Sequence, residues 1–248
     1  MNRRTFAWIM GLSACFTCGF AYQSVVHTAP NAQPAADSGI TKAFVMGKFY
    51  ANTDPRFGIV PAAMSSKTMY LQKEVITAFQ LMRREAMPKG IDLKIISGTR
   101  NFWEQKAIWD RKWVNNVNRF GTGIENAKHI LLYSSMPGSS RHHWGTDIDI
   151  NSLEPGYFRT GRGLAEITWL RNNANKYGFF EVYTPRKTGR LVGYEPEAWH
   201  WTYAPLSDRY LTYYLATVKP SDFSGFYGAE LAAPIRIIED YVKGIGAH

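Results

Sequence analysis

Residues 139–150 read SSRHHWGTDIDI and place two adjacent histidines before two aspartates. The TDIDI part alternates polar and apolar side chains at a period of two, which predicts a half-buried strand. On such a strand Asp147 and Asp149 share one face, and the two isoleucines share the other. Gly145 permits a tight turn before the strand, so that His142 can converge with Asp149 on one point. The stretch therefore predicts a central strand with a candidate metal site beside it.

The patterns on both sides of this stretch indicate a mixed fold. Several segments carry apolar residues at helical spacing, and others are short apolar runs bounded by glycine or proline. Helices at both ends and strands in the middle predict an α+β fold, with a small central antiparallel sheet and flanking helices. The expected helices cover 71–84, 102–116, 164–177, 207–218 and 233–242, and the expected strands cover 92–97, 146–150, 178–183 and 198–204.

The composition is that of a globular, basic protein. Hydrophobic residues make up 45% of the 248-residue chain, which is enough to bury a normal core. The 29 lysines and arginines exceed the 20 aspartates and glutamates, which gives a net charge of +9. These basic residues are scattered, with no run longer than two, whereas surfaces that bind nucleic acid gather them. We therefore expect no nucleic-acid partner.

The N-terminal residues resemble an export signal. Residues 1–21 combine a basic start with an apolar stretch shorter than the roughly 20 residues of a membrane span. Residues 22–42 are rich in Ala, Pro, Asn and Gln and predict a flexible tether, and 43–248 should form a single domain. Two processing routes stay open: cleavage after Ala21, or cleavage before Cys15 with a lipid on that cysteine. We expect membrane contact only through these residues.

The cysteines restrict the chemistry of the domain. Both of them, Cys15 and Cys18, lie in the leader. The rest of the chain therefore has no thiol nucleophile, no disulfide and no cysteine-ligated zinc site. Histidine, aspartate and glutamate remain as the strong metal ligands.

A second candidate block lies further along the chain. His200 follows Glu197 by three residues, so a turn would bring carboxylate and imidazole side by side. Two imidazoles, one carboxylate and an open position form the ligand set of a catalytic zinc, and a further carboxylate can act as general base. The alternative is structural: the histidines hydrogen-bond within the sheet, and Asp149 caps a turn.

Three blocks together resemble the zinc D-Ala-D-Ala carboxypeptidases, the family of the vancomycin-resistance D,D-carboxypeptidase. SRHHWGTDID, at 140–149, fits their Ser-x-His-x-x-Gly-x-x-x-Asp signature. SGTRNFWEQKAIW, at 97–109, resembles their Ser-Gly-x-Arg block with a following Gln, and EAWHW, at 197–201, resembles their Glu-x-Trp-His-Trp block. The blocks occur in the family's order. The resemblance implies the hedgehog/DD-peptidase zinc fold, which D,D-dipeptidases and L,D-carboxypeptidases share.

The resemblance also implies a set of site residues. In this chemistry zinc polarises the scissile carbonyl and acidifies its water, and the base passes a proton to the leaving amine. A guanidinium at a strand end is suited to bind the free carboxylate of the substrate. The implied ligands of one zinc ion are His142, Asp149 and His200, the implied base is Glu197, and the implied substrate-binding residues are Arg100, Gln105 and Ser140.

Two positions near these blocks leave their roles open. Asp147 stands where the family often has Ala, and it can orient a ligand histidine, bind a substrate amine or face water. We expect it not to bind zinc directly, because a fourth protein ligand would close the position that the water needs. His143 follows a ligand directly, so its side chain should point away from the metal. Of the two glutamates before His200, the spacing favours Glu197 as the base and places Glu195 in a loop.

Aromatic residues concentrate around the three blocks. Three tryptophans at roughly helical spacing predict a core-facing stripe rather than a sugar platform, namely Trp103, Trp109 and Trp113. Three tyrosines are candidates for contact with an oxyanion, and nothing in the sequence decides between Tyr183, Tyr194 and Tyr203.

The resemblance implies a zinc peptidase that acts on peptidoglycan stem peptides and removes the C-terminal D-Ala from a D-Ala-D-Ala end, and the signal-like residues 1–21 predict that it is exported. A basic domain suits such an acidic wall polymer. An L,D-carboxypeptidase, a murein endopeptidase or a non-catalytic zinc-containing wall-binding module would be alternatives. Glu197 favours catalysis, because a binding module needs no base. We expect a monomer in the periplasm or cell envelope, lipid-anchored if Cys15 is modified.

Overall fold

The computed structural model describes residues 39–186 and 190–246. The expected export signal and residues 22–38 of the expected tether lie outside these residues. Cleavage, lipidation at Cys15 and the domain boundaries therefore stay predictions. The chain from Gly39 onward forms one compact unit. Among the helices of the described part, none combines the length and the apolar character that a membrane crossing requires.

An antiparallel sheet of four strands forms the centre of this unit. Its strands lie in the order β3 (Ile95–Ser97), β4 (Asp147–Ile150), β6 (His200–Tyr203) and β5 (Phe179–Glu181). Two strands that are distant in sequence, β4 and β6, thus occupy its middle and pair antiparallel. This arrangement confirms the predicted α+β fold with a small antiparallel sheet. A separate antiparallel pair consists of β1 (Phe57–Ile59) and β2 (Tyr70–Gln72).

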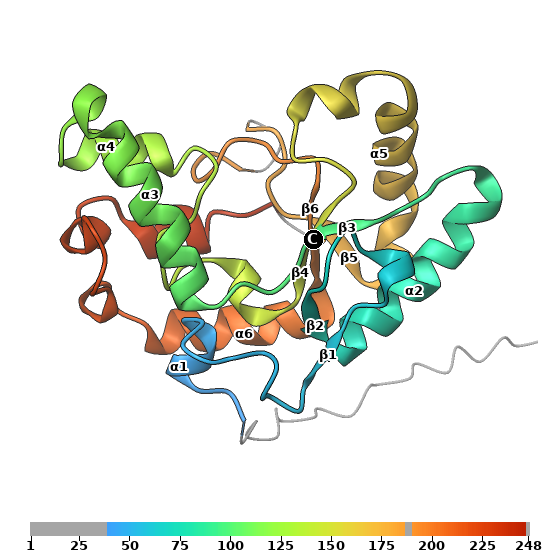
Figure 1. The fold of residues 1–248 in the computed structure, drawn as a ribbon, viewed down its shortest axis with the longest axis horizontal. Coiled ribbons are helices and arrows are strands. Elements are labelled where there is room, and N and C mark those ends of the chain that lie inside the picture. The colour runs from blue at the N-terminus through green and yellow to red at the C-terminus, as the bar shows by residue number, and fades with distance from the viewer. Residues whose placement is uncertain (1–38, 187–189, 247–248) are drawn as a thin grey trace, which may run out of the picture. The chain divides into compact units, whose positions relative to one another are not determined.

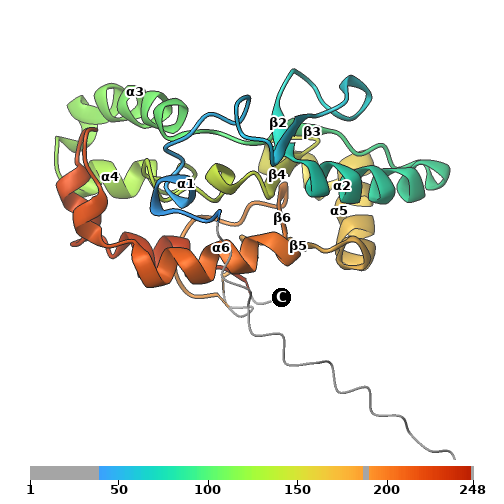
Figure 2. The same cartoon turned by 90° about the horizontal axis from the view of Figure 1, so that it is seen from below.

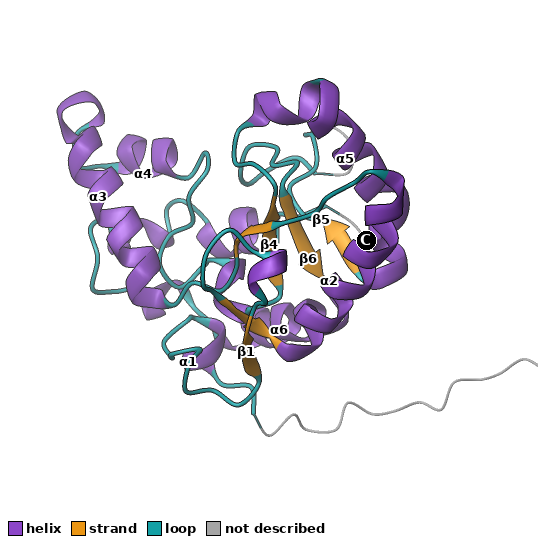
Figure 3. Ribbon diagram, turned by 45° about the vertical axis from the view of Figure 1, so that its right-hand side comes forward, coloured by secondary structure: helices purple, strands orange, loops and turns teal. Residues whose placement is uncertain are grey.

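Helices lie on both sides of the four-stranded sheet (Figures 1 and 3). On one side are α2 (Lys73–Ala86) and α5 (Gly161–Asn173), and on the other are α3 (Phe102–Phe120) and α4 (Ile124–Ile130). Figure 2 shows the same separation after a turn of 90°, with α6 (Ala204–Thr217) running along the lower edge. The short α1 (Lys42–Val45) contacts α6.

Strand β4 is buried on both faces, so the expectation of a half-buried strand is wrong in that respect. Ile148 and Ile150 pack with residues of α2 and α5 in one apolar core. The opposite face carries Asp147 and Asp149, which are buried against polar partners. A second apolar core joins residues of α3, α4 and α6. The alternation predicted which side chains share a face, but not that both faces are covered.

The start of α3 is fixed next to Arg100. Asn101 Oδ1 accepts the N–H of Glu104 at 2.9 Å, and Glu104 Oε2 accepts the N–H of Asn101 at 2.8 Å. This reciprocal capping satisfies N–H groups that have no partner within the helix. Arg100 directly precedes the capping residue Asn101, so its backbone is held in a defined position before the helix. The helix continues to Phe120, beyond its expected end at residue 116.

Two expected helices differ from the structure. The helix expected from residue 71 begins later, because Tyr70–Gln72 pairs with β1 instead. The helix expected over 233–242 is wrong, since its second half is a separate π-helical segment, Ile237–Val242. Arg236 before this segment has a φ of +58°, which takes the backbone out of the right-handed helical path. The spacing of apolar residues does not reveal such a position.

The tryptophans of α3 divide between core and surface. Trp109 and Trp113 are buried in the apolar core, as the helical stripe predicts. Trp103 is 44% exposed and stacks on Tyr50, with ring centroids 4.9 Å apart. The core prediction is therefore wrong for Trp103.

Candidate metal centre

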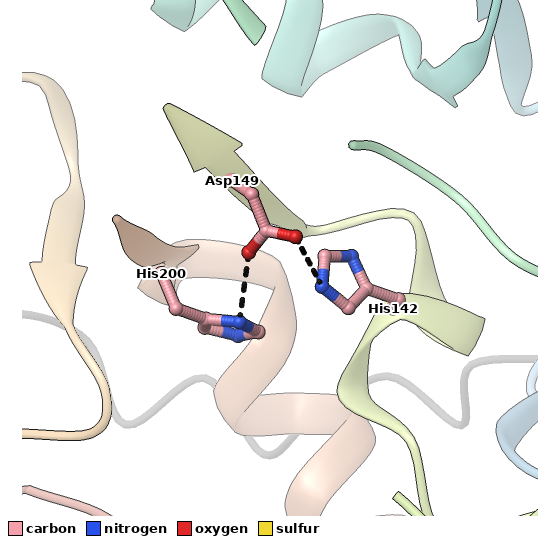
Figure 4. A group of neighbouring side chains, drawn as sticks. All are labelled: His142, Asp149 and His200. Atoms are coloured by element: carbon pink, nitrogen blue, oxygen red, sulfur yellow. Dashed lines mark ion pairs between the residues drawn. The ribbon is translucent and has the colours of Figure 1, made fainter. Parts of the chain in front are cut away.

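The register of two neighbouring strands brings two candidate ligands together. Asp149 of β4 pairs directly with His200 of β6. Directly opposed residues of an antiparallel pair project from the same face of a sheet. His142 comes from the short 3-10 helix η3 (Arg141–Trp144), and Gly145, with a φ of +69°, turns the chain from η3 into β4. Figure 4 shows the three side chains converging from these elements.

The three side chains lie within reach of a single ion. His142 Nε2 is 3.3 Å from Asp149 Oδ2, and His200 Nδ1 is 3.1 Å from Asp149 Oδ1. One potential ligand atom from each residue lies within 4.8 Å of the others, and all three residues are buried. The structure thus brings together the three residues that the family resemblance implies as ligands.

Hydrogen bonds to other groups orient both imidazoles. His142 Nδ1 donates to the carbonyl oxygen of Gly98 at 2.9 Å. His200 Nε2 donates to Asp147 Oδ2, also at 2.9 Å. These bonds leave Nε2 of His142 and Nδ1 of His200 directed toward Asp149. Two imidazole nitrogens and one carboxylate oxygen beside a cavity fit one zinc ion, with a coordination position left for water or substrate.

Asp147 is buried behind His200 and has no exposure to solvent. Its Oδ2 also accepts from Arg141 Nε at 2.9 Å, and its Oδ1 accepts from Thr202 Oγ1 at 2.7 Å. Burial alone would raise the pKa of Asp147, but the charge of Arg141 and the hydrogen bond from His200 hold that pKa well below its usual range. Of the roles that the sequence left open, the structure shows that Asp147 orients a candidate ligand.

Glu197 lies at the turn before His200. The N–H of His200 donates to the carbonyl oxygen of Glu197 at 3.0 Å, and Glu197 Oε2 lies 3.6 Å from His200 Nδ1. Burial, with a further contribution from the charge of Asp149, raises the pKa of Glu197 to about 8 against the opposing charge of His200. A carboxyl group with this pKa can accept and return a proton near neutral pH. Glu195 lies in a loop, as expected, and pairs with Arg186 at 3.0 Å.

A cavity of 480 Å³ opens onto these residues. Arg100 and Ser140 line it, and both Arg100 Nε and Ser140 Oγ are buried without a hydrogen-bond partner among the described residues. Unpaired buried polar groups beside a cavity indicate a ligand that would bind them. Tyr183 and Tyr194 also line the cavity, and burial raises the pKa of both hydroxyls, which therefore remain protonated donors.

Two residues singled out in the sequence lie outside the lining of this cavity. Gln105 is 1% exposed, and its Nε2 donates to the carbonyl oxygen of Ser135 at 2.7 Å. Because Ser135 lines the cavity, Gln105 supports the cavity wall from behind. The hydroxyl of Tyr203 donates to Glu74 at 2.8 Å, away from the cavity. Of the three candidate tyrosines, Tyr183 and Tyr194 thus remain placed to contact a substrate, and Tyr133 lines the cavity as well.

His143 points away from the candidate ligands and holds the backbone of Arg100. Its Nδ1 donates to the carbonyl oxygen of Arg100 at 2.7 Å, and its Nε2 accepts the N–H of Gly138 at 3.1 Å. Burial lowers the pKa of His143 to about 3, so the ring is neutral and can donate and accept at once. A side chain at Gly47 would overlap this ring. Nothing in the spacing of the sequence indicates the contact with Arg100.

The cavity also has basic residues that were not expected there. Arg111 and Lys112 of α3 line it together with Ile108. Arg111 and Lys112 follow Ile108 by three and four residues, and residues at this spacing lie on one face of a helix. The sequence therefore already indicated that these side chains share a face.

The chain is similar to known carboxypeptidases. The family model described as VanY, D-alanyl-D-alanine carboxypeptidase, matches residues 68–206. A Bacillus subtilis (strain 168) protein named as a candidate carboxypeptidase, YodJ, is 34% identical over 136 residues, which are 54% of this chain and 46% of that protein. A D-alanyl-D-alanine carboxypeptidase of Enterococcus faecalis (strain ATCC 700802 / V583) is 30% identical over 118 residues, which are 48% of this chain and 42% of that protein. Each match spans less than half the length of the relative.

Two solved structures resemble part of this chain. The LdcB LD-carboxypeptidase is 27% identical, with a TM-score of 0.49, over 67% of this chain and 79% of that chain. A mutant of the vancomycin-resistance D,D-pentapeptidase VanY in complex with Zn(II) is 24% identical, with a TM-score of 0.45, over 62% of this chain and 88% of that chain.

Proposed function

Because the chain belongs to the VanY D-alanyl-D-alanine carboxypeptidase family, we propose that it removes the C-terminal D-Ala from peptidoglycan stem peptides that end in D-Ala-D-Ala. The observation that carries this proposal is the convergence of His142, Asp149 and His200 on one cavity beside Glu197. The three donors fit one zinc ion, and the neighbouring carboxyl group is suited to proton transfer. Arg100 adds a guanidinium to the same cavity, and its buried Nε has no hydrogen-bond partner among the described residues.

Different residues of the chain have different roles in the proposed hydrolysis. Zinc, when bound by these ligands, supplies the Lewis acidity that polarises the scissile carbonyl and favours loss of a proton from water. Glu197 accepts the proton of the attacking water and then donates it to the amine of the leaving D-Ala. Asp147 keeps His200 oriented throughout, because its hydrogen bond determines which ring nitrogen faces the cavity.

Cleavage of a C-terminal residue requires a group that binds its free carboxylate. Arg100 presents a planar guanidinium, suited to bidentate binding, from a backbone position that His143 holds. Ser140 Oγ, buried and unpaired in the same cavity, can donate a further hydrogen bond. The hydroxyls of Tyr183 and Tyr194 are donors for the carbonyl oxygen that becomes negative as water adds.

Hydrolysis of defined muropeptides tests this proposal. The zinc-loaded full-length protein should release one D-Ala from a pentapeptide stem and stop at the tetrapeptide, and a chelator should abolish the release. Mass spectrometry of the products measures both. Release from the tetrapeptide alone would reassign the activity to an L,D-carboxypeptidase, and cleavage of cross-linked dimers alone would reassign it to an endopeptidase. Zinc-dependent binding without cleavage would indicate a wall-binding module.

We further propose that the protein is exported to the periplasm or cell envelope, where its proposed substrate lies. The basic start and apolar stretch within residues 1–21 support this. The mass of the mature N-terminus in a cell-envelope fraction would distinguish cleavage after Ala21 from a lipidated Cys15. Recovery of the unprocessed chain alone would contradict export.

A further inference from the structure

A basic strip, consisting of Arg111 and Lys112, lies on the face of α3 that lines the candidate site. Arg100, the residue proposed to bind the terminal carboxylate, lies just before the same helix and lines the same cavity. These three cationic side chains therefore line the cavity together with the proposed zinc ligands and Glu197, and Arg141 and Glu154 are further charged residues of its lining.

Within the part of the chain that the structure describes, none of these three cations forms an ion pair. Glu154 lines the same cavity, however, and the charge of Glu197 acts on Arg100 and Lys112 from a longer distance. Lys112 Nζ donates only to the neutral hydroxyl of Ser134, at 2.6 Å. Burial lowers the pKa of Lys112, and the charges of Arg100 and Arg111 lower it further. An anion placed among these groups would relieve their mutual repulsion.

Arg111 and Lys112 lie further along the chain and along α3 than Arg100, the residue proposed to bind the terminal carboxylate. Arg111 lies nine residues beyond Phe102, the first residue of α3, which is about 14 Å at 1.5 Å per residue, and Arg100 lies two residues before Phe102. The long side chains shorten this distance, and a few residues of extended peptide at ~3.3–3.6 Å each would cover it. A strip at this distance along the cavity can reach a substrate residue upstream of the cleaved bond.

We infer that Arg111 and Lys112 bind a second carboxylate of the substrate, carried by a residue upstream of the cleaved bond. This inference rests on the proposed function, because it specifies which stem peptides the site prefers. A guanidinium binds a carboxylate through two parallel hydrogen bonds, and an ammonium adds a compact charge. Stem peptides can present such a carboxylate from a γ-linked D-glutamate at position two or from a diaminopimelate at position three.

Four synthetic pentapeptides distinguish these two sources. Each ends in D-Ala-D-Ala, and together they combine D-glutamate or D-isoglutamine at position two with diaminopimelate or L-lysine at position three. With the zinc-loaded full-length protein, kcat/KM for the stem with both carboxylates should exceed that for the stem with neither by about tenfold or more, mainly through KM. Comparison of the two stems that carry only one of these carboxylates shows whether Arg111 and Lys112 bind the carboxylate at position two or the one at position three.

Variants test whether the basic strip causes the preference for stems with upstream carboxylates. The double variant Arg111→Gln/Lys112→Gln should bring the ratio of the two kcat/KM values close to one. The matched control Arg119→Gln removes a charge from the last turn of the same helix, outside the cavity lining, and should keep the wild-type ratio. Arg111 is exposed, so the single variant Arg111→Gln should fold. It should also lower the ratio of the two kcat/KM values, and it replaces the double variant if that variant does not fold.

The outcomes separate this inference from the proposed function. Equal rates on all four stems, or an unchanged ratio in the double variant, would overturn the inference and leave the carboxypeptidase activity intact. Failure to hydrolyse any of the stems in the presence of zinc would overturn both.

Discussion

His200 donates a hydrogen bond from Nε2 to Asp147 Oδ2 at 2.9 Å, and both side chains are buried. This bond leaves Nδ1 as the nitrogen of His200 that faces Asp149. Arg141, whose Nε donates to the same Oδ2 of Asp147, supplies the charge that keeps the carboxylate ionised. The proposed zinc site therefore depends on a buried ion pair that is not part of the ligand set.

Asp147→Ala should weaken zinc binding by about 10–100-fold, because groups that orient a metal ligand typically contribute this much to affinity. It should also lower the free energy of unfolding by about 3–5 kcal/mol, since Arg141 would remain buried without its partner. Competition with a chromophoric chelator measures the affinity, and denaturant unfolding measures the stability.

The double variant Asp147→Ala/Arg141→Met separates the two effects. It should recover most of the lost free energy of unfolding, because no unpaired charge is buried. Its zinc affinity should stay low. Wild-type zinc affinity in Asp147→Ala would show that Asp147 does not orient His200.

Glu197→Gln should lower kcat by about 10²–10⁴-fold, because the amide keeps the shape of the side chain but cannot accept a proton. The variant should still bind one zinc ion. Rates on a pentapeptide stem and elemental analysis of the same sample check both statements. Glu195→Gln is the matched control, since Glu195 pairs with Arg186 in a loop, and its rate should equal that of the wild type. Near-normal turnover by Glu197→Gln would mean that another group accepts the proton.

The zinc affinity of the metal-free protein should increase with pH up to about 9. Burial lowers the pKa of His200, but hydrogen bonds to Asp147 and Asp149 outweigh burial and raise that pKa to about 9. Below this pH, Nδ1 carries a proton that zinc must displace, so the affinity should fall by about tenfold for each unit of pH. Zinc titrations from about pH 6 to 10 measure this, and an affinity that does not change with pH would contradict the raised pKa.

His143→Leu should raise KM several-fold with a smaller effect on kcat, because the carbonyl of Arg100 loses the hydrogen bond that positions it. Stability should fall by about 1–3 kcal/mol, since that carbonyl and the N–H of Gly138 lose their partner. His143→Gln should restore part of both losses. His129→Gln, on the exposed side of α4, is the control and should change neither. An unchanged KM in His143→Leu would show that the contact does not position Arg100.

Much of the site could be predicted because its residues lie in or beside short local patterns. The period of two in TDIDI placed Asp147 and Asp149 on one face, and His200 contacts both of them in the structure. The spacing between Glu197 and His200 predicted a turn, and the backbone hydrogen bond of that turn is present. Such patterns are visible in a sequence because backbone geometry sets the period.

The remaining features depend on contacts between distant segments. Arg141 bonds both Asp147 and Thr202, which are neighbours only because β4 and β6 pair in this register. His143 meets the carbonyl of Arg100 across 43 residues of chain. No periodicity in the sequence encodes the register between strands or the packing of a loop against a helix start. These roles therefore became visible only in the structure.

The central claim is that His142, Asp149 and His200 hold the one zinc ion that the proposed carboxypeptidase requires. Stepwise addition of zinc to the metal-free full-length protein, with the release of D-Ala from a pentapeptide stem as the readout, tests this claim most directly. The rate of release should rise in proportion to zinc and level off at one equivalent, and the His200→Ala variant should show no such rise. Release that does not depend on zinc, or no release at any zinc concentration, would contradict the account.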